Sequence, residues 1–247
     1  MLEAALRRDR AIVTAGILGL AALAWVHVAR MAEVPGTMAA TMPGMDGQSG
    51  FAWLAGMWTV MMVAMMLPSA MPTILLFAAV SRRRRLQGRP AVPVAVFTLG
   101  YLLAWTVYAT TAAAIQWELH RWALLSPAMA TASPLLGGGL LVAAGLYQWM
   151  PLKGACLSQC RSPLGFFAAE WREGAGGALV MGMRHGAFCV GCCWLLMALL
   201  FVSGVMNVLW VVAIAGFVLA EKLLPGGRTL GRLAGLVLVG WGAWLVV

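Results

Sequence analysis

The sequence is dominated by hydrophobic runs that are too long and too weakly charged for the core of an ordinary soluble protein. A membrane span needs about 20 apolar residues to cross the roughly 30 Å hydrocarbon layer, and barrel strands would alternate polar and apolar residues. Only 10% of the residues are charged, against roughly 25% in soluble domains. We therefore expect an all-α polytopic transmembrane helix bundle, forming a single integral-membrane domain over residues 1–247, with about seven spans at 11–30, 52–79, 91–117, 134–151, 179–203, 205–221 and 229–247.

The basic residues predict how the bundle is oriented. With the N-terminus in the cytoplasm, 15 of the 17 Lys and Arg residues fall on the inner side, as the positive-inside rule requires. The net charge of +9 is thus explained by topology, and we expect no nucleic-acid partner. Six spans would remain if segments 179–203 and 205–221 formed one re-entrant hairpin. The lipid bilayer is the expected environment.

Five cysteines and one histidine form the strongest candidate site. Cys156 and Cys160 are four residues apart and would share a helix face. The second group has the same helical spacing and comprises His185, Cys189, Cys192 and Cys193. Because adjacent helical residues point about 100° apart, we expect only one of Cys192 and Cys193 to share a site with Cys189. Thiolates select soft ions such as Cu(I), and imidazole also suits zinc and copper. The alternative is that these cysteines are small buried hydrophobes.

Methionines form a second candidate set in segment 52–79. Two adjacent rows at four-residue spacing contain Met57, Met61 and Met65, and Met62 and Met66. Thioether sulfur could bind Cu(I) without losing a proton, although methionine also fills gaps in ordinary cores. Pro68 follows the rows and should kink the helix. Gly182 with Gly186, and Gly231 with Gly235, are small-residue pairs that let helices pack closely, and we expect them to pack within one bundle.

At these residues the chain resembles a bacterial family of predicted metal-binding integral membrane proteins of unknown function. The resemblance is carried by the methionine segment 57–69, by the cysteine segment 153–163, by Gly186–Met197 and by Glu221-Lys222. It implies a multi-span bundle in the bacterial inner membrane that binds a metal. It implies no particular reaction.

The leading hypothesis is a membrane protein that binds a soft metal ion and passes it on, with copper favoured and zinc as the alternative. Methionines in the outer loop (Met38, Met42 and Met45) and thiols expected near the inner face would favour inward movement. A soluble metal chaperone or a metalloprotein client would be the partner. The competing hypotheses are a thiol-disulfide oxidoreductase using Cys156/Cys160 and Cys189/Cys192, a membrane metalloenzyme, and an assembly protein without a small-molecule role.

Overall fold

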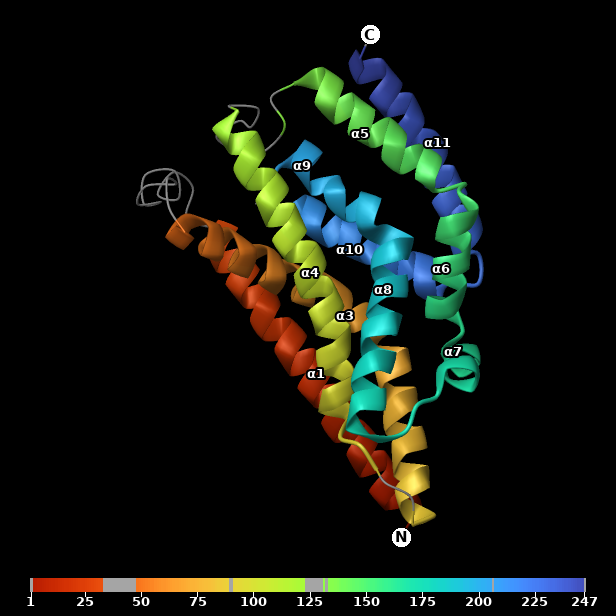
Figure 1. Cartoon of the computed structure of the whole chain (residues 1–247). Helices are drawn as coiled ribbons and strands as arrows, with labels where there is room; N and C mark the ends of the chain where they lie inside the picture. The colour runs from red at the N-terminus through yellow and green to blue at the C-terminus, as the bar shows by residue number, and fades with distance from the viewer. Residues whose placement is uncertain are drawn as a thin grey trace.

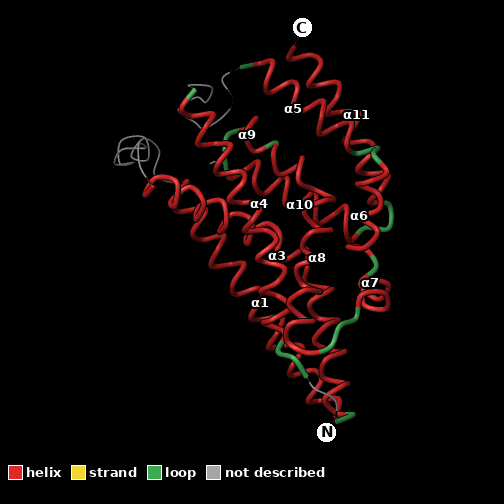
Figure 2. The backbone as a smooth tube through the Cα atoms, viewed as in Figure 1, coloured by secondary structure: helices red, strands yellow, loops and turns green. Residues whose placement is uncertain are grey.

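The protein is all-helical in the part of the chain that its computed structural model describes, which comprises residues 2–32, 48–88, 91–122, 131, 133–205 and 207–246 (Figures 1 and 2). Met38, Met42 and Met45 lie outside these residues. The helices are α1 (Leu2–Ala32), α3 (Gln48–Leu86), α4 (Val94–Arg121), α5 (Pro134–Tyr147), α6 (Pro151–Arg161), α7 (Pro163–Glu170), α8 (Gly174–Ala198), α9 (Leu200–Ser203), α10 (Val208–Leu223) and α11 (Gly227–Val246).

Each of the seven expected hydrophobic segments contains at least one helix, but the count of seven spans is not confirmed. Five stretches are long and apolar enough to cross a membrane, namely 10–32, 50–86, 94–121, 174–203 and 227–246. The pair α5 and α6 would make a sixth span, bent by 64°. The helix α10 has only 16 residues, fewer than a span needs. The cytoplasmic position of the N-terminus stays a prediction.

The outer surface of the bundle is rich in large apolar side chains, as a lipid-facing surface requires. Leu209, Trp244 and Leu23 are 76%, 75% and 70% exposed. Contiguous exposed apolar surface is rare on soluble monomers. The exposed side chains therefore agree with the hydropathy of the helices in pointing to a membrane environment.

Proline divides the segment between α5 and α8 in a way that the hydrophobic pattern did not predict. Met150 has extended backbone angles immediately before Pro151, because proline disfavours the helical conformation of the residue before it. Pro151 opens α6 and Pro163 opens α7, the position at which the missing proline N–H costs nothing. The stretch between the expected spans 134–151 and 179–203 is thus mostly helical.

Glycines set the two closest helix crossings. A Cβ atom at Gly182 of α8 would collide with the carbonyl oxygen of Phe97, and Gly100 of α4 lies opposite it. Gly235 of α11 meets Gly145 of α5 in the same way, and Figure 1 shows α5 and α11 side by side near the C-terminus. The small-residue pairs therefore pack helices within the bundle, as expected.

The helix α3 continues through Pro68 and Pro72 and carries the methionine rows through the interior. It packs beside α1 and α4. The helix α8 packs against α4 and against α6. This arrangement places the methionines of α3 and the cysteines of α8 in one buried cluster.

Candidate metal site

The second cysteine group occupies one buried stripe of α8. His185, Cys189 and Cys193 are one turn apart and are 2%, 1% and 1% exposed. Met181 and Met197 extend the same four-residue spacing in both directions and are also fully buried. The sequence pattern could have revealed these two methionines, since they continue the spacing that defined the site. A single helix face thus carries four sulfur atoms and one imidazole.

The stripe lies near the middle of its candidate span. The span covers residues 174–203, and Cys189 is 15 residues after its first residue. We expected the cysteines near one membrane face because the hydrophobic run was taken to begin at residue 179. The helix begins five residues earlier, at Gly174, because the glycine-rich start of α8 is helical as well.

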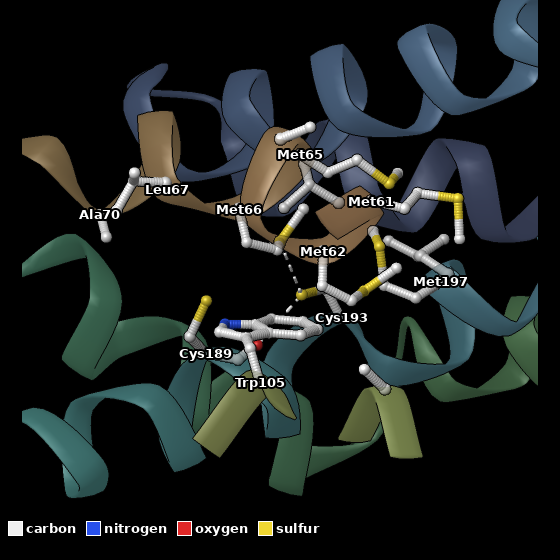
Figure 3. Packing of buried hydrophobic residues seen from close by; sticks show 14 of the residues in the cluster. Met61, Met62, Met65, Met66, Leu67, Ala70, Trp105, Cys189, Cys193 and Met197 are labelled. Carbon is white, nitrogen blue, oxygen red and sulfur yellow. Dashed lines mark hydrogen bonds between the residues drawn. The ribbon is translucent and has the colours of Figure 1, made fainter. Parts of the chain in front are cut away.

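The methionine rows of α3 are buried along their whole length. The row of Met62 and Met66 reaches toward α8, whereas Met61 and Met65 point away from Cys193 (Figure 3). All five are at most 5% exposed, namely Met57, Met61, Met62, Met65 and Met66. Met66 and Met62 point toward Cys193 and Met197 in Figure 3. The Sδ atom of Met66 lies 3.9 Å from the Sγ atom of Cys193. Thioether and thiol sulfur from two helices therefore meet directly.

The two cysteine groups, separated in sequence, come together where α6 packs on α8. The thiol of Cys160 interacts with the thiols of Cys189 and Cys192. Cys156 approaches the backbone of α8 at Gly191, where an added Cβ atom would lie 2.7 Å from its Sγ atom. Tyr147, the last residue of α5, donates a hydrogen bond of 2.5 Å to the carbonyl oxygen of the same Gly191. All five cysteines are free thiols.

Cys192 and Cys193 face different helices, but both thiols also interact with Cys189, whereas we expected only one of them to share a site with it. Both thiols donate hydrogen bonds to the Cys189 carbonyl oxygen, at 3.1 and 3.0 Å. Beyond that shared contact, Cys193 faces Met66 of α3, whereas Cys192 interacts with Cys160 of α6. We call the group of Met66, Cys160, Cys189, Cys192 and Cys193 the sulfur cluster.

Three polar side chains that the sequence analysis did not assign to the site surround Cys189. Lys222 of α10 donates hydrogen bonds to Cys189 Sγ and Ser69 Oγ, both at 2.9 Å. The hydroxyl of Tyr101 lies 3.1 Å from Cys189 Sγ and donates to the Met66 carbonyl oxygen at 3.0 Å. The sequence alone could have singled out Lys222, because it lies in a short apolar helix and ionisable groups inside a bundle usually have a functional partner.

His185 has an unusual environment for a buried histidine. Its ring is surrounded by Phe166, Tyr101 and Phe97, with centroid distances of 5.2, 5.9 and 6.2 Å. Its Nδ1 atom is buried and has no hydrogen-bond partner within the described residues. A buried unpaired nitrogen is costly. In the tautomer that carries its proton on Nε2, this atom is a free electron-pair donor one turn from Cys189.

The described residues hold no group of three or more His, Cys, Asp or Glu side chains that could bind a metal ion. The contacts of the sulfur cluster instead join one sulfur to the next, with Cys189 at their centre, and they include a thioether. Cu(I) is the ion that thiolate and thioether ligands select together, whereas structural zinc sites are closed by four Cys or His ligands. The assignment of these residues as metal ligands stays a prediction.

Two comparisons, with curated proteins and with solved structures, found no match to this chain. A third, with protein families, matched residues 55–245 to the family PpoB2, described as copper chaperone. The match covers 191 of the 247 residues, and it includes the methionine rows, all five cysteines and Lys222. The chain therefore belongs to the PpoB2 copper chaperone family.

Proposed function

We propose that this protein is a membrane copper chaperone that binds Cu(I) at the sulfur cluster and passes it to another protein. The observation that carries the proposal is the 3.9 Å contact between Met66 Sδ and Cys193 Sγ, in a buried region that also contains Cys189 and Cys192. The family description supports copper as the ion. The hydrophobic helices support a membrane location, which we take to be the bacterial inner membrane.

The donor set suits capture followed by release. Thiolates of Cys189 and Cys193 would supply the tight ligands, and Cys160 and Cys192 lie close enough to exchange with them. Met66 would supply a neutral thioether, which binds Cu(I) without releasing a proton. Metal binding to thiols releases protons because only the thiolate is a ligand. Zinc is the poorer candidate, because no closed set of Cys, His or carboxylate ligands occurs among the described residues.

Lys222 provides the charge that such a site requires. Two thiolates bound to one Cu(I) ion carry a net negative charge, and burial of an unpaired charge is strongly unfavourable. The ammonium group of Lys222 lies 2.9 Å from Cys189 Sγ and is itself buried. It can therefore neutralise the loaded site without leaving its position. In the metal-free protein the same ammonium group contacts the sulfur that the metal would bind.

The stripe on α8 and the rows on α3 offer a series of neighbouring ligands for ligand-exchange transfer. Met197, Cys193, Cys189 and His185 follow one another by one helical turn, which is about 5.4 Å along the axis. A soluble metal chaperone or a metalloprotein client is the proposed partner at the end of this series. Inward transfer remains the proposed direction, and it depends on the predicted orientation of the N-terminus.

Metal analysis of the purified protein tests the proposal. Wild type loaded with Cu(I) under reducing conditions should retain copper after desalting, and Cys189→Ser and Cys193→Ser should each retain much less. Leu substitution of the exposed Met183, on the same helix, provides a sulfur-removing control. Equal copper retention in wild type and in the Cys189→Ser/Cys193→Ser double variant would refute the proposal.

The contact of Cys160 with Cys192 favours thiol-disulfide exchange as a second candidate function. Oxidation of this pair would form one S–S bond and release two protons and two electrons, which a quinone or a disulfide partner must accept. Thiol trapping after rapid acid quenching separates the two functions. A disulfide that forms and is reduced with turnover supports the redox function, whereas five thiols that stay reduced while copper is bound support the chaperone.

A further inference from the structure

A large apolar groove opens along the C-terminal part of α3, beyond the methionine rows. It has a volume of about 890 Å³. Its walls come from α1, α3, α7 and the segment that leads into α4, and they include Val13, Pro72, Leu75, Leu76 and Leu164. Figure 1 shows α1 lying beside the C-terminal half of α3. The groove contains none of the residues of the sulfur cluster.

Two hydrogen bonds between α3 and the segment before α4 fix the shape of the groove. Ser81 of α3 donates a hydrogen bond of 2.9 Å to the Val92 carbonyl oxygen and accepts one of 3.1 Å from the Val92 N–H. Both residues line the groove. The segment before α4 is thus held against α3 by a reciprocal pair of bonds, so the wall that it forms is pre-organised.

Three arginines line the same groove. They are Arg10 of α1, and Arg82 and Arg85 of α3. Arg82 and Arg85 are three residues apart and lie on neighbouring positions of the helix surface. No acidic side chain in the described part of the chain pairs with Arg10 or Arg85. Two guanidinium groups thus face a largely apolar groove without an anion.

Three arginines that do not line the groove have partners among the described residues. Arg84, between Arg82 and Arg85 in sequence, pairs with Glu173 at 2.5 Å and lies 4.7 Å above the Trp171 ring. Arg184 pairs with Glu170, and Arg161 donates to the carbonyl oxygens of Glu221 and Pro225. Arg10 and Arg85 differ from these three arginines in having no acidic partner among the described residues.

We propose that this groove binds one anionic phospholipid, with its phosphate at Arg10, Arg82 and Arg85 and an acyl chain along the apolar wall. Guanidinium groups bind phosphate through paired hydrogen bonds, and basic pockets between transmembrane helices are typical sites for anionic headgroups. Three of the contributing segments are, or lead into, candidate membrane spans. The molecule that reaches such a groove is a lipid, and the arginines select an anionic one.

Native mass spectrometry of the purified full-length protein tests the site directly. Protein mixed with phosphatidylglycerol should retain one lipid per chain, and protein mixed with phosphatidylcholine should not. Arg10→Gln/Arg85→Gln should bind phosphatidylglycerol about thirtyfold more weakly, because each basic residue near an anionic lipid contributes about a tenfold or smaller factor. Millimolar inorganic phosphate should not displace the lipid, since it cannot use the apolar wall.

Two further variants make the result interpretable. Arg228→Gln/Arg232→Gln removes the same charge from two exposed residues outside the groove and should bind like wild type. Ala79→Trp fills the groove from an exposed position of α3 while keeping every arginine, and it should lose the lipid. Undiminished phosphatidylglycerol binding by both Arg10→Gln/Arg85→Gln and Ala79→Trp would overturn the proposal, as would equal binding of phosphatidylcholine by wild type.

Discussion

Lys222 of α10 donates a hydrogen bond to the thiol sulfur of Cys189 of α8 across 2.9 Å. The same ammonium group bonds Ser69 of α3, so one buried cation joins three helices at the sulfur cluster. Burial of a cation is costly unless charged or hydrogen-bonding groups compensate it. The contact therefore stabilises the fold of the metal-free protein. In the proposed function the same ammonium group also compensates the negative charge of the copper site.

Replacing Lys222 tests that double role. Lys222→Met should bind Cu(I) about tenfold to a hundredfold more weakly, because a hydrogen bond to a charged group contributes about 1.5–3 kcal/mol. Competition with a chromophoric Cu(I) chelator measures the loss. Lys222→Arg keeps the charge and should recover part of the affinity. Unchanged affinity in Lys222→Met would show that the lysine has no role in metal binding.

The thioether of Met66 can be removed almost without changing the packing. Leu and Met have similar volumes and exchange at a cost of less than about 1.5 kcal/mol in cores, so Met66→Leu should fold. It should weaken Cu(I) binding by about tenfold, equivalent to about 1.4 kcal/mol. The matched control is Met183→Leu on the exposed side of α8. If both variants bind copper equally well, Met66 is a packing residue only.

The buried ion pair beside the cluster should matter for stability. Lys153 Nζ lies 2.7 and 2.8 Å from the two carboxylate oxygens of Glu221, and both residues are nearly inaccessible. Lys153 also bonds Gln148. Glu221→Gln would leave the ammonium group without its anion and should lower the free energy of unfolding by roughly 3–5 kcal/mol. Thermal unfolding in detergent measures this loss.

Two controls define the effect of the ion pair. Glu118→Gln breaks the exposed ion pair in which Glu118 Oε1 lies 3.3 Å from Arg121 Nη1. This substitution should change the free energy of unfolding by less than about 1 kcal/mol. The double variant Lys153→Met/Glu221→Leu removes both buried charges and should be more stable than Glu221→Gln. A Glu221→Gln protein as stable as wild type would contradict the assignment of this pair as a stabilising contact.

The crossing of α4 and α8 should not tolerate a larger residue at Gly182. A Cβ atom there would overlap the Phe97 carbonyl oxygen, and overpacking costs about 1–3 kcal/mol. Gly182→Ala should therefore lower the unfolding temperature. It should also weaken copper binding, because the crossing holds Tyr101 against Cys189. Gly216→Ala meets open space and should be neutral or slightly stabilising, since alanine favours helix.

Sequence patterns identified the helices because their cause is local. Hydrophobic runs of about 20 residues can bury their backbone polar groups only as helices, and every expected segment is helical. Four-residue spacing likewise placed Met62 with Met66 and Cys189 with Cys193 on shared faces. Helices outside the apolar runs were harder to predict. The expected span ended at Pro151, but α6 begins there, after the extended residue Met150.

The sequence by itself determined that this protein is a helical bundle with two rows of soft ligands, because helix formation and ligand spacing depend on neighbouring residues. Only the tertiary structure decided that Cys160 reaches Cys189 and Cys192, that Met66 meets Cys193, and that Lys222 lies beside Cys189. These contacts join residues 29 to 127 positions apart. They depend on helix crossings set by Gly100, Gly182 and Gly191, and close packing between helices is not encoded in the periodicity of any single one.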